Sequence, residues 1–507
     1  MKRTIVSLLL SMIYILAFAQ TEGTLQERLE VLMSDTSLKE AQVGICVRTA
    51  DGRTIADINA GRMLVPASNM KLLSTGAALQ ALGADYRYET RIGYYGEVVD
   101  GVLQGNLHII GGGDPLLGSK DSIATPLEKT FSQWEKMLRE AGIRRIEGHV
   151  VGDGRWLDGP VEEPTWLWND LGTYYGTGVT GLMLYENMQS FNVSAGVNVG
   201  DDVKIEPSYP VTPWMQYRYE CSTGEKGTGD KLYMYTSEFA PIAAIRGTFG
   251  VDRAAKRVDC SNKFPEYTCA DMFVTWLDKR GIDCSEGAAD YRLCLLPGHE
   301  AREDIFCPQS ELKIIGSTLS PSLGRIVYET NHASNNLFAE TLLRTLGEDC
   351  EGSSSYEASY VAVDRVLKDM GVDTSYGVRI QDGSGLSRQN YVSPDFFCRF
   401  LAAMLGSEAY PEFLRSLPVP GGNGSLQYNM KGQPETLRSR IKVKSGSMNG
   451  VRCYSGYILP TTDAGADVSS DDVKANTLIV SIMTNNCTAP TWKVRPLLDK
   501  VLIEIAQ

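Results

Sequence analysis

Three groups of residues in this 507-residue chain have types and spacing suited to acyl-transfer chemistry. The first is Ser68 followed three positions later by Lys71, in the stretch PASNMKLLSTGAAL. On a helix this spacing places both side chains on one face. A serine hydroxyl is a weak nucleophile, and a lysine whose pKa is lowered by burial or by a second cation would deprotonate it. We therefore predict Ser68 as the nucleophile and Lys71 as its base.

The second and third groups lie far downstream. Ser334 and Asn336 form a Ser-x-Asn pair in NHASNNLFAETLL, at a predicted break between helical stretches. There Ser334 would relay a proton to a leaving amine, and Asn336 would hydrogen-bond the substrate amide. Lys444, Ser445 and Gly446 lie on a predicted strand. Lys444 and Ser445 would bind a terminal carboxylate, and Gly446 would leave room for a substrate strand.

Assembled in one place, the three groups would support each other. The backbone amides of Ser68 and Ser447 would form an oxyanion hole. The positive charge of Lys444 would help to keep Lys71 neutral and ready to act as a base.

Two of the three patterns recur, so each alone is a weak signal. An exposed helix face or an ordinary turn explains an isolated copy. The three motifs follow one another on a predicted helix, loop and strand respectively. This agreement between motif, order and predicted secondary structure favours a catalytic site. The Lys-Ser/Thr-Gly motif occurs once. Ser-x-x-Lys has further copies at Ser310–Lys313 and Ser439–Lys442, and Ser-x-Asn has further copies at Ser190–Asn192 and Ser447–Asn449.

The elements that must position these residues are predicted from hydrophobic periodicity. Pro66 and Ser68 stand where a strongly apolar helix begins. Helices and strands alternate at both ends of the chain, and apolar–polar alternation with glycine turns predicts a β-rich block between them. The simplest topology is one domain, formed by residues 20–91 and 311–507, that is split by an insertion over residues 92–310.

Composition and the N-terminus predict an exported globular protein. Hydrophobic residues make up 43% and charged residues 22%. Lys2 and Arg3, the apolar run 5–16 and an Ala-x-Ala site ending at Ala19 predict a signal peptide over residues 1–19. The run is too short to span a membrane, and no second long one follows. We expect a periplasmic protein without a stable membrane span.

Charge and histidine usage argue against two classes of partner. The formal net charge of −13 is unfavourable for a nucleic-acid partner, which selects a basic face. The four histidines are scattered and no Cys-x-x-Cys pair occurs, so we predict no metal site and no cofactor.

Eleven cysteines raise the question of disulfides. An exported chain forms disulfides readily, so one or two bridges are expected within a cluster in the middle third, and the odd count leaves at least one thiol free. The cluster consists of Cys260, Cys269, Cys284, Cys294 and Cys307.

Beyond the three groups, the chain resembles the S13 family of D-alanyl-D-alanine carboxypeptidases/endopeptidases, the class C low-molecular-weight penicillin-binding proteins. The resemblance covers nearly all of the mature chain. It implies an α+β fold. A β-lactamase/transpeptidase-like domain, which is an antiparallel sheet flanked by helices, would be split by a large β-rich insertion of two nested domains. These would cover about 92–186 with 290–310, and 187–289. Further segments that carry the resemblance are GGGDPLL (111–117), PTWLWNDLGTYYG (164–176), DGSGLSRQN (382–390) and SLPVPGGNGSL (416–426).

The resemblance also implies an activity. Ser68 would attack the carbonyl between two D-alanines and release the terminal one, and water would hydrolyse the acyl-enzyme. The substrates would be peptidoglycan stem peptides and cross-links, and β-lactams would be inhibitors. Asp170 resembles the family's acidic residue that grips the end of the diaminopimelate side chain, although a helix N-cap is an alternative role. Ser445 stands where threonine is commoner.

Two rival functions stay open. A β-lactamase or esterase on the same scaffold is disfavoured by the long insertion and by the lack of an acidic general-base loop. A non-catalytic peptidoglycan-binding protein is disfavoured because every catalytic side chain is present. The sequence leaves the oligomeric state open.

Overall fold

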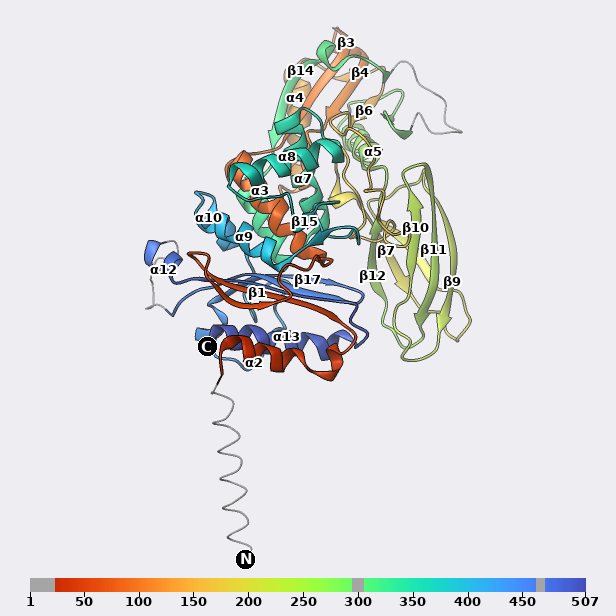
Figure 1. Cartoon of the computed structure of the whole chain (residues 1–507). Coiled ribbons are helices and arrows are strands. Elements are labelled where there is room, and N and C mark those ends of the chain that lie inside the picture. Colours follow the sequence, from red (N-terminus) through yellow and green to blue (C-terminus); the bar gives the residue numbers. More distant parts are fainter. Residues whose placement is uncertain (1–22, 294–304, 462–469) are drawn as a thin grey trace, which may run out of the picture.

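The structure is a computed structural model that describes residues 23–293, 305–461 and 470–507 (Figure 1). The predicted signal peptide and its cleavage site therefore lie outside the described residues. No helix within the described ranges is long and apolar enough to cross a membrane.

A five-stranded antiparallel sheet joins the two ends of the chain. Its order is β17-β18-β19-β1-β2, so a strand from the N-terminal part pairs with the last strand of the chain, with Gln42 opposite Asn485. The interior strands β1 and β19 are rich in β-branched residues, and consecutive residues along them are buried, as expected where both faces of a sheet are covered. The five strands are β1 (Gln42–Thr49), β2 (Thr54–Ile58), β17 (Ile441–Met448), β18 (Val451–Ile458) and β19 (Leu478–Asn485).

Helices cover both faces of this sheet, which confirms the predicted α+β class (Figure 1). On one face, α2 (Leu25–Met33) and α13 (Thr491–Ala506) share a core with the sheet through residues such as Leu29 and Leu498. The other face holds a larger helical layer, in which α3 is almost entirely buried. This layer contains α3 (Lys71–Leu82), α6 (Leu323–His332), α7 (Asn336–Glu351), α8 (Tyr356–Asp369), α9 (Pro394–Leu405) and α10 (Tyr410–Ser416).

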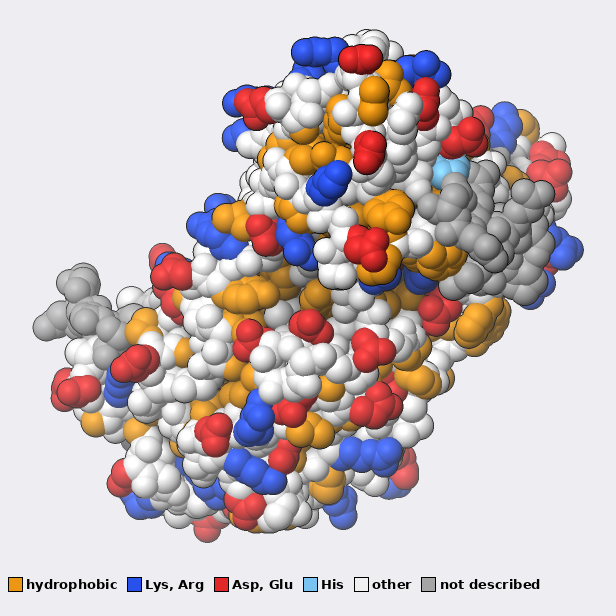
Figure 2. All heavy atoms as spheres, turned by 90° about the horizontal axis from the view of Figure 1, so that it is seen from above, with side chains coloured by type: hydrophobic (Ala, Val, Ile, Leu, Met, Phe, Trp, Pro, Cys, Tyr) orange, Lys and Arg blue, Asp and Glu red, His pale blue; other side chains and the backbone are white. Residues whose placement is uncertain are grey.

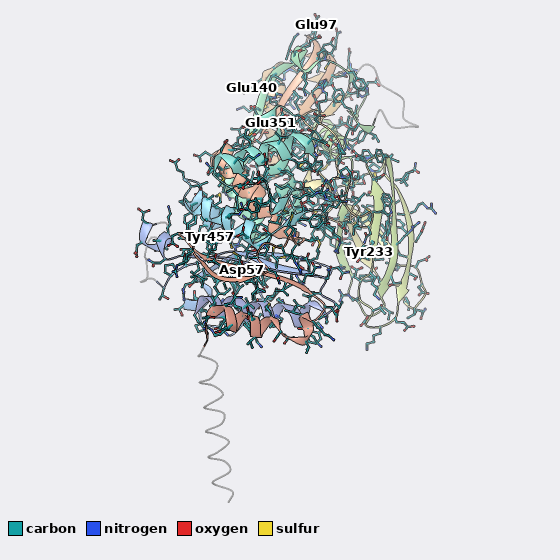
Figure 3. All side chains as sticks on the ribbon, in the orientation of Figure 1. Asp57, Glu97, Glu140, Tyr233, Glu351 and Tyr457 are labelled. Atoms are coloured by element: carbon teal, nitrogen blue, oxygen red, sulfur yellow. The ribbon has the colours of Figure 1, made fainter. Side chains whose placement is uncertain are left out.

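A mixed six-stranded sheet lies beyond the helical layer, and the labelled Glu97 marks the far end of one of its strands (Figure 3). Its strand β14 (Lys313–Leu319) pairs with β3 (Glu89–Val99). This sheet thus begins three residues before the predicted insertion and ends nine residues after it, and the boundaries of the insertion stay a prediction. Its other elements are β4 (Val102–Ile110), β5 (Arg145–Ile146), β6 (Val150–Asp153), β13 (Ala288–Asp290) and the packed helices α4 (Leu127–Glu140) and α5 (Pro265–Asp278).

Two three-stranded sheets, β10-β11-β9 and β12-β7-β8, share one hydrophobic core that includes Phe191 and Phe249. The strand content of this region agrees with the sequence, but helix α5 was not expected there. Tyr233, labelled in Figure 3, lies at the start of β10. The strands are β7 (Met188–Ser194), β8 (Lys204–Tyr209), β9 (Gln216–Gly224), β10 (Tyr233–Ser237), β11 (Ala240–Gly250) and β12 (Lys256–Ser261).

The prediction of disulfides in the cysteine cluster is wrong for the residues that the structure describes. Cys260, Cys269, Cys284 and Cys307 are all free and buried, while Cys294 lies outside the described ranges. Cys260 lies in one hydrophobic cluster, Cys269 and Cys284 in another and Cys307 in a third, and burial raises the pKa of both Cys260 and Cys284 to about 12.

Candidate active site

The Ser-x-x-Lys motif lies on one buried turn at the start of α3. Ser68 belongs to the short 3₁₀ turn η2 (Ala67–Met70), and Lys71 is the first residue of α3. The Nζ atom of Lys71 lies 3.1 Å from the Oγ atom of Ser68. Ser68 is partly exposed, whereas Lys71 is fully buried. The spacing of the motif therefore produces the predicted contact between hydroxyl and amine.

Lys71 has two further partners besides Ser68. Its Nζ atom lies 2.7 Å from Oδ1 of Asn336 and 2.7 Å from the backbone oxygen of Ser384. Burial lowers the pKa of Lys71 to about 7, while the charges of Asp382 and Glu340 oppose this shift. An amine with a pKa near neutrality, in contact with a serine hydroxyl, is suited to act as a general base.

The Ser-x-Asn motif forms the break between α6 and α7, as the sequence predicts. Ser334 has a left-handed backbone with φ of 59°, and its Oγ accepts a hydrogen bond of 2.9 Å from Nζ of Lys444. Asn336 is the first residue of α7, and its Nδ2 donates to the backbone oxygen of Tyr175 at 2.9 Å. The short segment thus contacts both lysines of the site.

Lys444 lies on β17 and is fully buried. Burial holds the pKa of Lys444 well below its usual range, and the charge of Lys71 lowers it further. Burial is the main cause of the low pKa of Lys71, and the additional help expected from the charge of Lys444 stays a prediction. Ser445 is half-buried, and its Oγ lies 3.5 Å from Oγ of Ser425.

Two glycines allow neighbouring backbones to approach the turn of Ser68 closely. A Cβ atom on Gly446 would lie 2.4 Å from the backbone oxygen of Pro66. A Cβ atom on Gly385, whose φ is +83°, would lie 1.8 Å from the backbone oxygen of Ala67. Strand β17 and the loop that carries Gly385 therefore reach the turn of Ser68 only because these side chains are absent.

We expect Gly446→Ala to reduce acylation of the protein by a β-lactam by about 100-fold, because displacements near 1 Å at a reacting centre have effects of that size. The added methyl group must push β17 away from η2, and Lys444 and Ser447 move with the strand. The second-order acylation rate measures the effect. Gly61→Ala is the matched control, since nothing lies within 4 Å of a Cβ atom there. Equal rates for the two variants would show that the close approach is unimportant.

Five of the predicted residues line a cleft of about 880 Å³, whereas Ser445 and Gly446 do not. Asp170 lies on its wall, where its Oδ1 accepts a hydrogen bond of 3.1 Å from the hydroxyl of Tyr175. Burial raises the pKa of Asp170, while the hydrogen bond from Tyr175 and the positive charge of Arg388 oppose the shift. Of the predicted residues, those that line the cleft are Ser68, Asp170, Ser334, Asn336 and Ser447, whereas Lys71 and Lys444 lie buried behind them.

The recurrent copies of the motifs lie in other settings. Ser310 and Lys313 are exposed, with Lys313 at the start of β14. Ser190 is buried in β7, where its Oγ donates to Asp259 at 2.6 Å. Ser439 follows the short helix α11 (Glu435–Arg438) and precedes β17. Only the copy at Ser447–Asn449 lines the cleft, at the end of β17.

Several groups at the site are absent from the sequence prediction. The Ser384 carbonyl belongs to the loop between the two-residue strands β15 (Val378–Arg379) and β16 (Tyr391–Val392). This loop is held by the buried carboxylate of Glu340, which accepts hydrogen bonds from the amides of Gly383 and Ser384. The only signal in the sequence was the family-like segment DGSGLSRQN.

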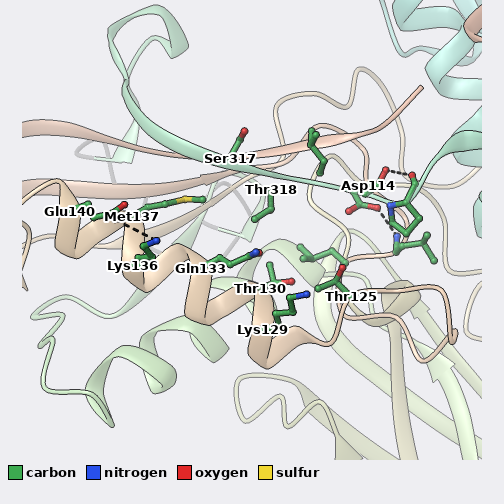
Figure 4. Close-up of a pocket in the computed structure, with 15 residues that line it drawn as sticks. Asp114, Thr125, Lys129, Thr130, Gln133, Lys136, Met137, Glu140, Ser317 and Thr318 are labelled. Atoms are coloured by element: carbon green, nitrogen blue, oxygen red, sulfur yellow. Dashed lines mark hydrogen bonds and ion pairs between the residues drawn. The ribbon is translucent and has the colours of Figure 1, made fainter. Parts of the chain in front are cut away.

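A separate cavity of about 490 Å³ lies between α4 and β14 (Figure 4). Its wall includes Asp114, Lys129, Gln133 and Thr318, and it contains none of the predicted site residues. Across the described ranges, no group of three or more His, Cys, Asp or Glu side chains is arranged to hold a metal ion.

Known proteins share both the sequence pattern and the fold. A D-alanyl-D-alanine carboxypeptidase from Actinomadura sp. (strain R39) is 26% identical over 450 residues, covering 86% of this chain and 78% of the relative. The D-alanyl-D-alanine carboxypeptidase DacB of Haemophilus influenzae is 23% identical over 413 residues, covering 80% of this chain and 79% of the relative.

The crystal structure of penicillin-binding protein 4 from Haemophilus influenzae superimposes with a TM-score of 0.76 at 21% identity. The match covers 94% of this chain and 97% of that one, so the two proteins share a fold. The model of the D-Ala-D-Ala carboxypeptidase 3 (S13) family matches residues 25–494. The chain therefore belongs to the S13 family of D-Ala-D-Ala carboxypeptidases.

Proposed function

We propose that the protein is a serine-type D-Ala-D-Ala carboxypeptidase that acts through an acyl-enzyme on Ser68. Membership of the S13 family supports the carboxypeptidase activity. The observation that carries the serine mechanism is the contact of 3.1 Å between Ser68 and the buried amine of Lys71, whose pKa is about 7. A nucleophile in hydrogen-bond reach of its base is the arrangement that such catalysis needs.

In the acylation step, Oγ of Ser68 attacks the carbonyl carbon between the two D-alanines while its proton passes to Nζ of Lys71. The C–N bond then breaks, and the leaving nitrogen takes a proton from Ser334, whose Oγ is held at 2.9 Å by Lys444. The proton on Lys71 passes to Ser334, so that the Ser334 hydroxyl is restored and the amine of Lys71 is neutral again. Free D-alanine leaves. Water next attacks the ester, Lys71 takes the proton of the water, and the C–O bond breaks to return the proton to Ser68.

The remaining predicted residues have roles in binding. The backbone amides of Ser68 and Ser447 stabilise the tetrahedral oxyanion. Ser445 and Lys444 receive the terminal carboxylate, and Asn336 hydrogen-bonds the substrate amide. Asp170, on the wall of the cleft, binds the free end of the diaminopimelate side chain, which extends the activity to cross-link endopeptidase cleavage. Peptidoglycan peptides are thus the proposed substrates of an exported, periplasmic enzyme.

We further propose that penicillin acylates Ser68 and is released slowly, so that it inhibits the enzyme. The solved structure of the Haemophilus influenzae penicillin-binding protein 4 in complex with a β-lactam supports such binding in a protein of this fold. A β-lactamase or esterase on this scaffold would instead release the acyl group rapidly. A non-catalytic peptidoglycan-binding protein would not be acylated at all.

One experiment separates these functions. The purified protein is treated with a fluorescent penicillin, the labelled peptide is identified by mass spectrometry, and release of D-alanine from a pentapeptide is measured in parallel. The proposal expects a stable label on Ser68 together with release of D-alanine. A stable label without D-alanine release contradicts the peptidase, and rapid turnover of the penicillin supports the lactamase.

We expect the acylation rate to rise with pH through about 7, because Lys71 accepts a proton only when its amine is neutral. Below that pH the protonated fraction grows, so the rate falls by about tenfold per pH unit. Rates measured with fluorescent penicillin between about pH 5.5 and about pH 9 test this. A rate that is flat across this range would exclude Lys71 as the titrating base.

A further inference from the structure

One wall of the catalytic cleft contains a strained turn that the mechanism does not use. Tyr185, Glu186 and Asn187 have φ angles of 52°, 56° and 52°, which are left-handed values. Residues other than glycine rarely adopt this conformation, and a run of three persists only where the surroundings impose it. Such strain is commonest at functional sites.

Contacts on both sides impose the turn. The amide of Tyr185 donates to the backbone oxygen of Leu117 at 3.0 Å. The buried side chain of Asn187 donates to the backbone oxygen of Gly178 at 3.0 Å, and its backbone oxygen accepts from the amide of Asn262 at 2.8 Å. Both neighbours of Glu186 are held by these contacts, and the side chain of Glu186 lies on the wall of the cleft.

Both carboxylate oxygens of Glu186 are occupied. Oε1 accepts a hydrogen bond of 2.7 Å from the hydroxyl of Ser119, and Oε2 accepts one of 2.8 Å from Nδ2 of Asn335. The side chain is only 8% exposed. Asn335 uses its other amide atom, Oδ1, to accept from the backbone amide of Phe338 at 3.2 Å, which caps α7. The cap fixes one end of this side-chain amide and Glu186 fixes the other.

Asn335 is the middle residue of the Ser-x-Asn motif. Ser334 before it contacts Lys444, and Asn336 after it contacts Lys71. Because Ser334 itself has a left-handed φ of 59°, the segment needs outside support to keep this geometry. We propose that Glu186 is a positioning residue, which orients Asn335 and thereby holds Ser334 and Asn336 against the two lysines. This inference rests on the proposed function of that site.

The hydrogen-bond pattern allows a test by exchanging donor and acceptor. In Asn335→Asp the helix cap survives, since aspartate is a good N-cap, but two carboxylates face each other across 2.8 Å. In the double variant Asn335→Asp/Glu186→Gln, the new amide nitrogen donates to the new carboxylate, and its oxygen still accepts from Ser119. Glu186→Gln alone can turn its amide to accept from Asn335 while the hydroxyl of half-buried Ser119 donates to water.

Acylation by fluorescent penicillin and thermal unfolding are measured for all variants at about pH 8, above the pKa of Lys71. We expect a loss of about 10- to 100-fold in the acylation rate for Asn335→Asp and for Glu186→Leu, because the reacting groups are misplaced. We expect rates within about threefold of the unaltered protein for Glu186→Gln and for the double variant. Glu140→Gln, on α4 away from the cleft, is the control.

Several outcomes would overturn the proposal. A double variant as slow as Asn335→Asp would show that the pair does not set the rate. A large loss in Glu186→Gln would mean that the charge of Glu186 matters rather than its geometry. Equal rates for Glu186→Leu and the unaltered protein would remove the positioning role. If the unaltered protein itself is not acylated, the proposed function fails instead.

Discussion

Replacing Ser68 by alanine is expected to abolish covalent labelling by penicillin and to lower D-alanine release by roughly 10⁴- to 10⁶-fold, the range found when a catalytic serine is removed. The variant keeps Lys71 and its contacts with Asn336 and Ser384, so the fold is not expected to change. Labelling on a gel and D-alanine release measure the two effects, and thermal unfolding checks the fold.

Ser310→Ala is the matched control for this variant. Ser310 is also followed by a lysine three positions later, but it is exposed in the short 3₁₀ turn η6 (Gln309–Glu311). Full labelling by penicillin is expected for Ser310→Ala. If Ser68→Ala is still labelled at one site while Ser310→Ala is not, the nucleophile has been assigned to the wrong copy of the motif.

The second large effect is expected for Lys71→Met. Methionine fills similar space in the buried position but removes the base, so acylation should fall by about 10²- to 10⁴-fold. The oxygens of Asn336 and Ser384 also lose their donor, and each buried acceptor without a partner costs about 1–3 kcal/mol, so the melting temperature should fall as well. Stopped-flow acylation kinetics and calorimetry measure the two changes.

Lys313→Met provides the comparison for this variant. Lys313 completes the exposed copy of the motif on β14. Its replacement should leave the acylation rate unchanged. The pH dependence of residual acylation in Lys71→Met adds a further check, because the rise through about pH 7 should vanish with the amine. If the rise with pH persists in Lys71→Met, another group is responsible for the titration.

The sequence indicated the structural setting of each copy of the motifs, because position along the chain carries physical information. Ser68 precedes an apolar stretch that predicts a buried helix, and residues Lys71 to Leu79 of α3 are all buried. Ser334 falls where two amphipathic stretches meet, which is the break between α6 and α7. In each case the pattern of apolar residues around the motif located it.

Backbone groups could not be predicted in this way. The carbonyl of Ser384 contacts Lys71, and that of Tyr175 contacts Asn336, but a carbonyl is present at every position of every chain. Which one reaches the site depends on the path of the loop. For Ser384 that path is set by the buried carboxylate of Glu340. Burial of a carboxylate is a property of the folded structure and leaves no local sequence pattern.

Tertiary packing produced one helix that the sequence had not indicated and overturned one expectation. Helix α5 lies within a strand-rich stretch, where its residues pack with β6 and β13 of the six-stranded sheet. The predicted disulfides failed: Cys260 and Cys269 lie in two different hydrophobic clusters, and Cys269 and Cys284 share one cluster without forming a bridge. Sequence proximity of cysteines indicates a bridge only if the fold also brings their side chains together.

The pairing of β1 with β19 has a consequence for the order in which the molecule acquires its structure. One edge of β1 is paired only when β19 (Leu478–Asn485) is present, and β19 lies more than four hundred positions later in the chain. Contacts of such sequence separation form late, because a long loop must close first. A growing or truncated chain that ends before β19 therefore has the residues of the site but not the sheet that aligns them. Activity should appear in a single step, when the last strand is added.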